Sequence, residues 1–255
     1  MTAQTQDAQT PRVVLVTGGN RGIGRSIAEA FRAQGDQVVV TYRSGEAPEG
    51  VDAVRCDVSD TASVDAAFTE IEKTWGPVDV VVANAGHSIA RPVLDCVDRF
   101  DTYERTVALN YLGAVGFAQP FLGAMAARGS GQLVGVTTTN ARMPVPGWAP
   151  YCASKAAFDS WLRCAEPELR QRGVAVSIVA FPLVRTPMIE PTYGAHPPLA
   201  MSAEAAARCV ERAVETRRAW IGPWWARPAE VLTAAAPVLS ARALGARSLP
   251  ALRRR

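Results

Sequence analysis

The chain has 255 residues and a net charge of +3, with 48% hydrophobic and 20% charged residues, a composition typical of globular proteins. Its 27 basic and 24 acidic residues are too close to balance to favour nucleic-acid binding, and no apolar stretch reaches the roughly 18 residues that a transmembrane helix needs. Only two of the basic residues are lysines, Lys73 and Lys155. The position of a lysine is therefore informative, because lysine takes part in proton chemistry more readily than arginine.

The segment from Met1 to Pro11 is polar and matches neither a signal nor a transit peptide, so we predict a frayed lead-in. The five cysteines are scattered and form no CxxC pair, which argues against disulfides and thiolate metal sites and indicates a reducing cytoplasm. The two histidines, His87 and His196, are far apart. They leave little material for a zinc site or a Ser-His-Asp triad, and we expect no metal.

Short β-branched runs alternate with longer segments of helical period along the chain. Strands are predicted at Arg12–Thr17, Gln37–Tyr42, Val51–Arg55, Val78–Ala83, Gln132–Thr138, Val174–Ala180 and Ala219–Gly222. Helices are predicted at Gly22–Gln34, Thr61–Trp75, Asp98–Arg128, Pro150–Arg172 and Ser202–Arg217. Near-continuous apolar strands that alternate with helices predict one Rossmann-like α/β domain. We expect a doubly wound parallel sheet of about seven strands with helices on both faces.

The sequence shows no internal repeat, and we expect one domain over residues 1–226 followed by a basic extension over residues 227–255. Residues 182–200 contain five prolines, have no periodicity and follow the sixth predicted strand. Ligands of open α/β sheets bind at the carboxyl ends of the strands. This loop is therefore predicted to cover a substrate.

The first predicted strand leads into Thr17–Gly24, with the sequence TGGNRGIG, and then into a helix. Glycines allow the backbone to turn tightly beside a pyrophosphate, which the amides and the dipole at the helix start attract. The motif in this context predicts dinucleotide binding. The candidate residues are Gly18, Asn20, Arg21, Gly22, Ile23 and Gly24.

The end of the second predicted strand reads Val-Thr-Tyr-Arg-Ser over residues 40–44, without the acid that usually binds the adenosine ribose hydroxyls. Arg43, next to Tyr42, offers a fork for a 2′-phosphate, and Arg21 is expected on the same side. We therefore predict NADP(H) rather than NAD(H), with Tyr42 and Arg43 as further cofactor-binding residues. The alternative is that both arginines are ordinary solvated side chains.

Tyr151 and Lys155 are four residues apart at the start of a predicted helix, and so share one helical face. The lysine ammonium is expected to lower the pKa of the tyrosine, which is near 10 when unperturbed. A tyrosine tuned in this way protonates a carbonyl oxygen during reduction. One of the chain's two lysines stands at the position that this chemistry needs.

Taken together, these motifs resemble the short-chain dehydrogenase/reductase family over residues 11 to 222. The resemblance also includes Asp57-Val58 after the third strand, Asn84-Ala85-Gly86 after the fourth strand, and Asn110. It implies that Asp57 and Val58 contact the adenine, and that Asn84, Ala85 and Gly86 line the ribose and support the sheet. It further implies that Tyr151 is the acid/base, that Lys155 tunes it and binds the nicotinamide ribose, and that Asn110 completes a water-linked proton relay with Lys155.

Two departures from the family pattern concern the substrate side of the site. Thr138 stands where the family usually has a serine that binds the substrate carbonyl; it offers the same hydroxyl but a stiffer side chain, and Thr137 or Thr139 remain alternatives. The sixth strand is followed by Pro-Leu-Val-Arg-Thr-Pro-Met at residues 182–188 instead of Pro-Gly, which is similar to a subset acting on fatty acyl or other long-chain carbonyl compounds. By resemblance, Pro182, Val184 and Thr186 contact the nicotinamide carboxamide and a phosphate. His87 is expected to line the wall of the site.

The last 29 residues carry six arginines and one acid, Glu230, hence +5, which leaves −2 for the rest of the chain. This segment combines apolar residues and arginines and follows several tryptophans, a composition that suits contact with a membrane surface or a hydrophobic substrate. Pro237 and Pro250 argue against a long helix. We favour packing over the substrate loop or a neighbouring subunit, with Arg253–Arg255 as a solvated end. The family usually forms dimers or tetramers through its two long helices, here Asp98–Arg128 and Pro150–Arg172.

The sequence thus predicts a cytoplasmic NADPH-dependent carbonyl reductase, a homodimer or homotetramer, that acts on a small-molecule carbonyl substrate. The expected substrate is a ketone or an acyl-linked carbonyl that is hydrophobic or attached to an acyl carrier, and we expect no nucleic-acid partner. Three alternatives stay open. They are a fatty acyl or β-ketoacyl thioester reductase, an enzyme of the same fold that performs non-redox cyclisation or dehydration, and a non-catalytic NADPH-binding protein.

Overall fold

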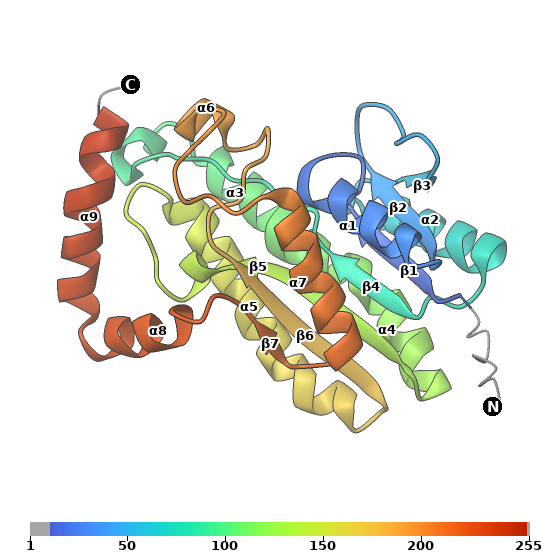
Figure 1. Cartoon of the computed structure of the whole chain (residues 1–255). Coiled ribbons are helices and arrows are strands. Elements are labelled where there is room, and N and C mark those ends of the chain that lie inside the picture. Colours follow the sequence, from blue (N-terminus) through green and yellow to red (C-terminus); the bar gives the residue numbers. More distant parts are fainter. Residues whose placement is uncertain (1–10, 254–255) are drawn as a thin grey trace, which may run out of the picture.

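Seven parallel strands form the central sheet of the computed structural model, which describes residues 11–253 (Figure 1). The strands are β1 (Val13–Thr17), β2 (Gln37–Tyr42), β3 (Asp52–Arg55), β4 (Val80–Ala83), β5 (Gly131–Thr138), β6 (Val174–Phe181) and β7 (Trp220–Ile221). Their order is β3-β2-β1-β4-β5-β6-β7, so the prediction of a doubly wound parallel sheet is confirmed. The predicted lead-in before Pro11 and the last two arginines lie outside the described residues.

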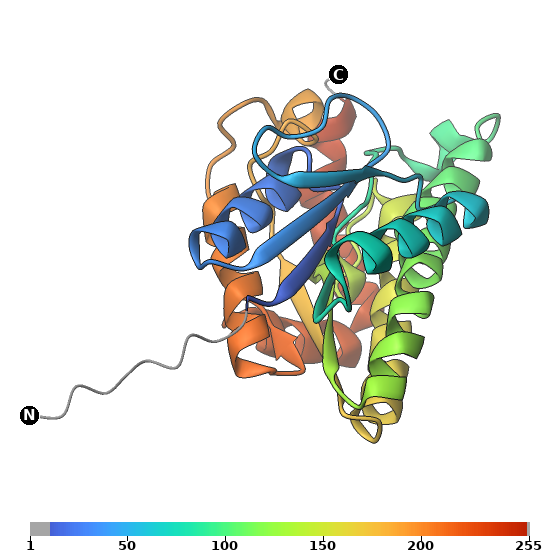
Figure 2. The ribbon, with the colours of Figure 1, turned by 90° about the vertical axis from the view of Figure 1, so that its right-hand side faces the viewer.

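Helices cover both faces of the sheet, as expected for parallel strands. In Figure 2, α1 (Gly22–Ala33) and α7 (Ala203–Thr216) lie on one side, while α2 (Thr61–Trp75), α4 (Ala114–Arg128) and α5 (Ala149–Arg170) lie on the other. The sequence of β1 does not alternate between apolar and polar residues because both faces of the strand are buried. Val14 and Val16 pack under α1 and α7, whereas Leu15 packs under α2, α4 and α5. Each side of the strand buries apolar side chains in a separate core layer.

The long helix predicted over Asp98–Arg128 is present with one irregularity. It begins with α3 (Asp101–Val107), widens into a π-helical turn at Ala108–Gly113, and continues as α4. Such wide turns are found most often at functional positions, and Asn110 stands inside this one. The hydrophobic periodicity alone did not reveal the irregularity.

The loop after β6 is largely irregular, as predicted, and its two ends are paired. Val184 forms an isolated parallel bridge with Met201, and a short helix, α6 (Glu190–Tyr193), lies between them. Two further short turns, η1 (Val93–Cys96) and η3 (Thr139–Ala141), were not predicted. Among the helices of residues 11–253, none combines the length and the apolar character needed to cross a bilayer.

The basic extension is helical, which corrects the expectation that its prolines exclude a long helix. It forms α8 (Ala226–Ala235) and the 17-residue helix α9 (Pro237–Arg253). Pro237 separates the two helices and opens α9, a position where the missing N–H costs nothing. Pro250 stands in the last turn, where its missing N–H removes one hydrogen bond and leaves the rest of the helix intact.

Candidate active site

The turn between β1 and α1 has the geometry that its glycines suggest. Gly18 and Gly22 adopt φ angles of +65° and +56°, in the left-handed region that favours glycine. A Cβ on Gly24 would lie 2.3 Å from the carbonyl oxygen of Gly18. The helix therefore starts close against the strand end only because this position lacks a side chain.

The start of α1 is open to an anion. Its N-cap residue, Arg21, makes no side-chain cap hydrogen bond, and the first turn carries no acid. The first backbone amides and the positive end of the helix dipole therefore remain available to a phosphate. Thr186, from the loop after β6, lies above this turn. A Cβ placed on Gly22 would be 3.5 Å from Thr186 Cγ2.

Positive charge gathers beside this turn at the end of β2. Asn20 Nδ2 donates to the carbonyl of Ser44 at 3.0 Å, which brings residues 43–44 next to the glycine turn. Arg43 lies 4.0 Å from Asp57, so that carboxylate only partly neutralises it. The positive electrostatic potential of these arginines also reaches His87. The pKa of His87 is lowered mainly by burial, and to a smaller extent by the charges of Arg105, Arg43 and Arg21. An anionic group bound here would relieve this repulsion.

The ends of β1 and β4 are joined where the strand order reverses. Thr17 Oγ1 accepts the amides of Asn84 and Ala85, both at 2.9 Å, and Asn84 Nδ2 donates to the carbonyl of Thr17 at 2.9 Å. Ligands of open parallel sheets bind in the crevice at this reversal. The hydrogen bonds hold Asn84 and Ala85 beside the glycine turn.

Asn110 is fully buried and joins the π-helical turn to two other elements. Its side-chain amide accepts from the His87 N–H and donates to the His87 carbonyl, both at 2.8 Å. It also donates to Ser154 Oγ at 3.0 Å, and that hydroxyl donates to the carbonyl of Tyr151 at 2.8 Å. Ser154 was missed from the sequence, although a serine directly before Lys155 on the same helix is a visible polar signal.

Lys155 is 5% exposed and lies beside Asn110 and Gly86. A Cβ on Gly86 would be 3.3 Å from Lys155 Nζ and 3.2 Å from Asn110 Oδ1. The ammonium donates to the carbonyl of Val136 at 3.0 Å, and burial lowers its pKa to about 8. The three predicted residues therefore surround one small volume at the carboxyl ends of β4 and β5.

Tyr151 and Thr138 form a second pair, which Ser154 links to Asn110 through the backbone carbonyl of Tyr151. Burial raises the pKa of Tyr151 to about 12, while a hydrogen bond with the Thr138 side chain opposes this rise. The expectation that Lys155 lowers the tyrosine pKa is therefore wrong for the chain without ligand, because burial dominates and the ammonium bonds to Val136. Of the three threonines, Thr138 is the one that meets Tyr151, since Thr137 Oγ1 donates to the carbonyl of Val179.

An aromatic pair beside Tyr151 was not predicted. The indole of Trp148, at the start of α5, stacks on the ring of Tyr193 in α6, with centroids 5.9 Å apart and planes 11° apart. Tyr193 is close enough to Tyr151 to raise its pKa further. Trp148 stands three residues before Tyr151, which was the available signal, whereas Tyr193 is brought near only by the tertiary fold.

The remaining candidate residues lie around the crevice with different degrees of burial. Tyr42 ends β2, and Pro182 is half-buried just after β6. The side chains of Ile23, Val58 and Val184 pack into the two core layers. These three residues are therefore placed to meet a ligand through their backbone.

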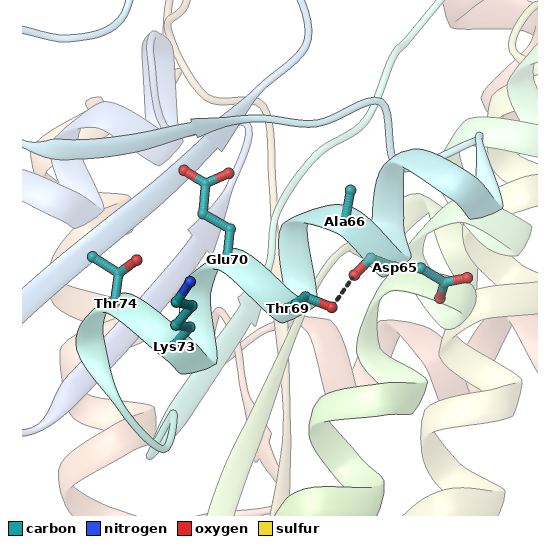
Figure 3. A pocket seen from close by; sticks show the side chains of 6 residues that line it. All are labelled: Asp65, Ala66, Thr69, Glu70, Lys73 and Thr74. Atoms are coloured by element: carbon teal, nitrogen blue, oxygen red, sulfur yellow. Dashed lines mark hydrogen bonds between the residues drawn. The ribbon is translucent and has the colours of Figure 1, made fainter.

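A separate hollow lies on the outward face of α2 (Figure 3). It is lined by Asp65, Ala66, Thr69, Glu70, Lys73 and Thr74. All six residues come from a single helix, and none belongs to the candidate site. The chain's second lysine is therefore on the surface. Among residues 11–253, no three His, Cys, Asp or Glu side chains gather in a way that would hold a metal ion.

Comparisons with known proteins point in the same direction. The model of the short chain dehydrogenase family matches residues 12–195. A fatty acyl-CoA reductase of Acinetobacter baylyi is 35% identical over 239 residues, 89% of this chain and 80% of that protein. The 3-oxoacyl-acyl-carrier-protein reductase MabA of Mycobacterium tuberculosis is 37% identical over 187 residues, 72% of this chain and 75% of that protein. A Burkholderia cenocepacia short chain dehydrogenase, solved in complex with NADP, has a TM-score of 0.79 at 26% identity, covering 91% and 97% of the two chains.

Proposed function

The chain belongs to the short-chain dehydrogenase/reductase family, and from this premise we propose that it reduces a ketone or an acyl-linked carbonyl group with NADPH. Two linked groups support the proposal: Thr138 bonds to Tyr151, and Lys155 and Asn110 lie at Gly86. Ser154 joins Asn110 to the backbone carbonyl of Tyr151. A proton donor, a second hydroxyl, a buried ammonium and a buried amide are the groups that carbonyl reduction needs beside a hydride source.

The cofactor part of the proposal rests on the glycine turn. The uncapped start of α1 suits a pyrophosphate, and Arg21 and Arg43 suit a 2′-phosphate. Asp57 and Tyr42 border the adenosine side, while residues 84–86 and Thr186 border the nicotinamide side. NADPH supplies the hydride when bound. The structural relative that was solved with NADP supports this choice of cofactor.

In the proposed reaction, Tyr151 donates its phenolic proton to the carbonyl oxygen, and Thr138 holds that oxygen by a hydrogen bond. The raised pKa keeps the phenol protonated at neutral pH, which is the form a proton donor requires. Lys155 stabilises the phenolate as it forms. Asn110, fixed by His87 and Ser154, holds the route by which the proton is replaced.

For the substrate, we propose a carbonyl compound with a long apolar part or an acyl thioester. Both named curated relatives are reductases of acyl derivatives, and residues 182–188 resemble those of a subset of the family that acts on fatty acyl or other long-chain carbonyl compounds. The stacked pair of Trp148 and Tyr193 adds an apolar wall beside Tyr151. We further propose a reducing cytoplasmic setting, in keeping with five unpaired cysteines, and a homo-oligomer formed through α4 and α5.

The proposal is tested by following NADPH absorbance with a panel of short ketones, long-chain ketones and 3-oxoacyl thioesters. Turnover should be highest for the long acyl compounds and should nearly vanish in Tyr151→Phe. Tyr103→Phe, a tyrosine on α3, is the matched control and should retain activity. Unchanged turnover in Tyr151→Phe would overturn the mechanism. Product formation without NADPH consumption would favour the non-redox alternative, and cofactor binding without any turnover would favour a binding protein.

A further inference from the structure

The helices of the basic extension expose their apolar residues instead of burying them. Trp224 is 87% exposed, Leu232 is 70% exposed and Leu239 is 71% exposed. Trp225, Val231 and Val238 are also exposed. Lone apolar residues on a surface are ordinary, but six large ones exposed between Trp224 and Leu239 are typical of a contact surface.

The side that faces the body of the protein is mostly small or polar. Its buried or half-buried residues up to Ser240 are Ala226, Ala229, Glu230, Thr233, Ala236 and Ser240, and Leu244 is the one large apolar residue that continues the series in residues 226–246. Glu230 bonds to Arg142, and Ser248 Oγ donates to the carbonyl of Pro146 at 3.0 Å. Helices that pack on a core normally bury an apolar stripe, so α8 and α9 have the reverse orientation.

Charge on this extension is divided in the same way. Its one acid, Glu230, is 14% exposed and turned toward the body. Arg242 is exposed three residues after Leu239 on the same helix, whereas Arg227 stacks on the ring of Trp220 in β7, 4.4 Å from its centroid. The outward side of the described part of the extension is therefore apolar and cationic, and it presents no carboxylate.

We propose that the outward face of α8 and α9, defined by Trp224, Val231, Leu232, Val238, Leu239 and Arg242, binds the surface of an anionic lipid bilayer. Indoles and aliphatic side chains enter the headgroup region, while arginines meet the lipid phosphates. The inference does not depend on the proposed reductase activity.

A second copy of the chain fits this face less well. A two-fold contact would place the same patch against itself, and each patch belongs to a segment with a charge of +5. Like charges would then meet without a compensating acid. A soluble acidic protein would satisfy the arginines but would leave unexplained the six large apolar side chains exposed between Trp224 and Leu239.

The placement of α9 connects this face to the active site. Figure 1 shows α9 ending beside α6, the short helix of the substrate loop. Met188 and Leu199 of that loop are exposed apolar residues as well. On a bilayer, the loop that covers the crevice would lie next to the lipid.

The test is co-sedimentation of the full chain with vesicles made of equal parts of phosphatidylcholine and phosphatidylglycerol, compared with pure phosphatidylcholine. Wild type should sediment with the anionic vesicles and bind the neutral ones at least about tenfold more weakly. Leu232→Asn/Leu239→Asn and Arg242→Glu should each weaken binding by about tenfold. Arg212→Glu, an equally exposed arginine on α7, is the matched control and should bind like wild type.

Two further readouts keep the outcomes distinct. Far-UV circular dichroism and turnover of a short soluble ketone should be the same for wild type and the extension variants, which shows that the fold is intact. Absence of wild-type binding to anionic vesicles would overturn the proposal, as would equal binding by the Leu232→Asn/Leu239→Asn variant. A dimer in sedimentation velocity that these variants dissociate, without vesicle binding, would also overturn it and assign the face to a second copy.

Discussion

Arg142 Nη1 donates to Glu230 Oε2 at 3.1 Å and joins the basic extension to the segment that follows β5. The same guanidinium donates from Nε to Asp159 at 3.0 Å. Arg142 and Glu230 are 17% and 14% exposed, so this contact is shielded from water far more than a surface ion pair. Because Arg142 stands four residues after Thr138, the contact also restrains the chain just beyond the candidate site.

Glu230→Gln should lower the free energy of unfolding by about 1 to 2 kcal/mol. Arg142 would lose one charged partner while keeping Asp159, so the cost is smaller than for a fully buried pair. Urea unfolding at neutral pH measures the change. Glu29→Gln breaks the exposed pair with Arg25 and should lower the free energy of unfolding far less, because water screens this pair. Equal losses in the two variants would contradict a shielded role for Glu230.

Thr138→Ser should keep kcat within a few-fold of wild type, whereas Thr138→Val should lower it by about 100-fold. Serine retains the hydroxyl that meets Tyr151, and valine retains the shape of threonine without the donor. Steady-state kinetics with a saturating carbonyl substrate distinguishes the two. Thr137→Val, which removes the hydroxyl bonded to Val179, should leave kcat nearly unchanged. A large loss in that control would move the role to the neighbouring threonine.

The rate of carbonyl reduction should fall as the pH rises through about 8. Burial lowers the pKa of Lys155 to about 8, whereas Tyr151 with a pKa of about 12 stays protonated. The ammonium that stabilises the forming phenolate is therefore the first charge to be lost. A pH profile of kcat/KM measures this. Arginine stays charged across this range, so any activity that remains in Lys155→Arg should not fall as the pH rises through about 8. A flat profile of kcat/KM for the wild type across this range would contradict the assignment.

Protein stability should respond to the same two groups with opposite signs. Lys155 has a folded-state pKa of about 8, below the ordinary 10.5, so the unfolded chain binds more protons between these values. Stability should therefore rise with pH across this window relative to Lys155→Met. Tyr151 has a folded-state pKa of about 12, above 10.0, and its contribution should be lost above pH 10. Thermal unfolding of the wild type and of Lys155→Met, measured at several pH values from about 8 upward, provides the comparison.

Arg43→Ala should reduce the preference for NADPH over NADH by about tenfold or more, through KM rather than kcat. The guanidinium at the end of β2 is only partly neutralised by Asp57, and a phosphate contact of this kind is worth about 1 to 3 kcal/mol. Kinetics with both cofactors measures the ratio. Arg25→Ala removes an exposed arginine on α1 that pairs with Glu29 and should leave the ratio unchanged. A similar change in both variants would point to general electrostatics.

The fold could be predicted largely from local patterns. The all-apolar runs and the glycine turn specify a parallel sheet whose strand ends meet, so the positions of Asn84 beside the glycine turn and of Gly86 beside Lys155 follow from topology. The short helices α6 and α8 were not predicted, because they carry little periodic signal. Tyr193, for example, reaches Tyr151 only because the substrate loop folds back between Val184 and Met201.

Other features depend on distant partners. The pairing of Glu230 with Arg142 spans 88 residues, and no local pattern indicates it. The tyrosine pKa was predicted from the spacing to Lys155, but that spacing contains no information on burial, which is the largest cause of the observed rise. The inverted orientation of α8 and α9 is likewise invisible to a periodicity that assumes apolar residues face inward.

The π-helical turn at Ala108–Gly113 also determines which way the neighbouring residues point. Up to the turn, single buried positions recur at steps of four, at Thr102, Thr106 and Asn110, whereas after it they come in adjacent pairs such as Phe117 with Ala118 and Phe121 with Leu122. Each such step overshoots an ideal α-helical turn by about 40°. The wider turn takes back part of this drift, so Asn110 reaches the crevice while Ala118 and Leu122 still face the core. Deleting one residue there would restore a regular α-helix, and Asn110 would lose its alignment with His87 and Ser154.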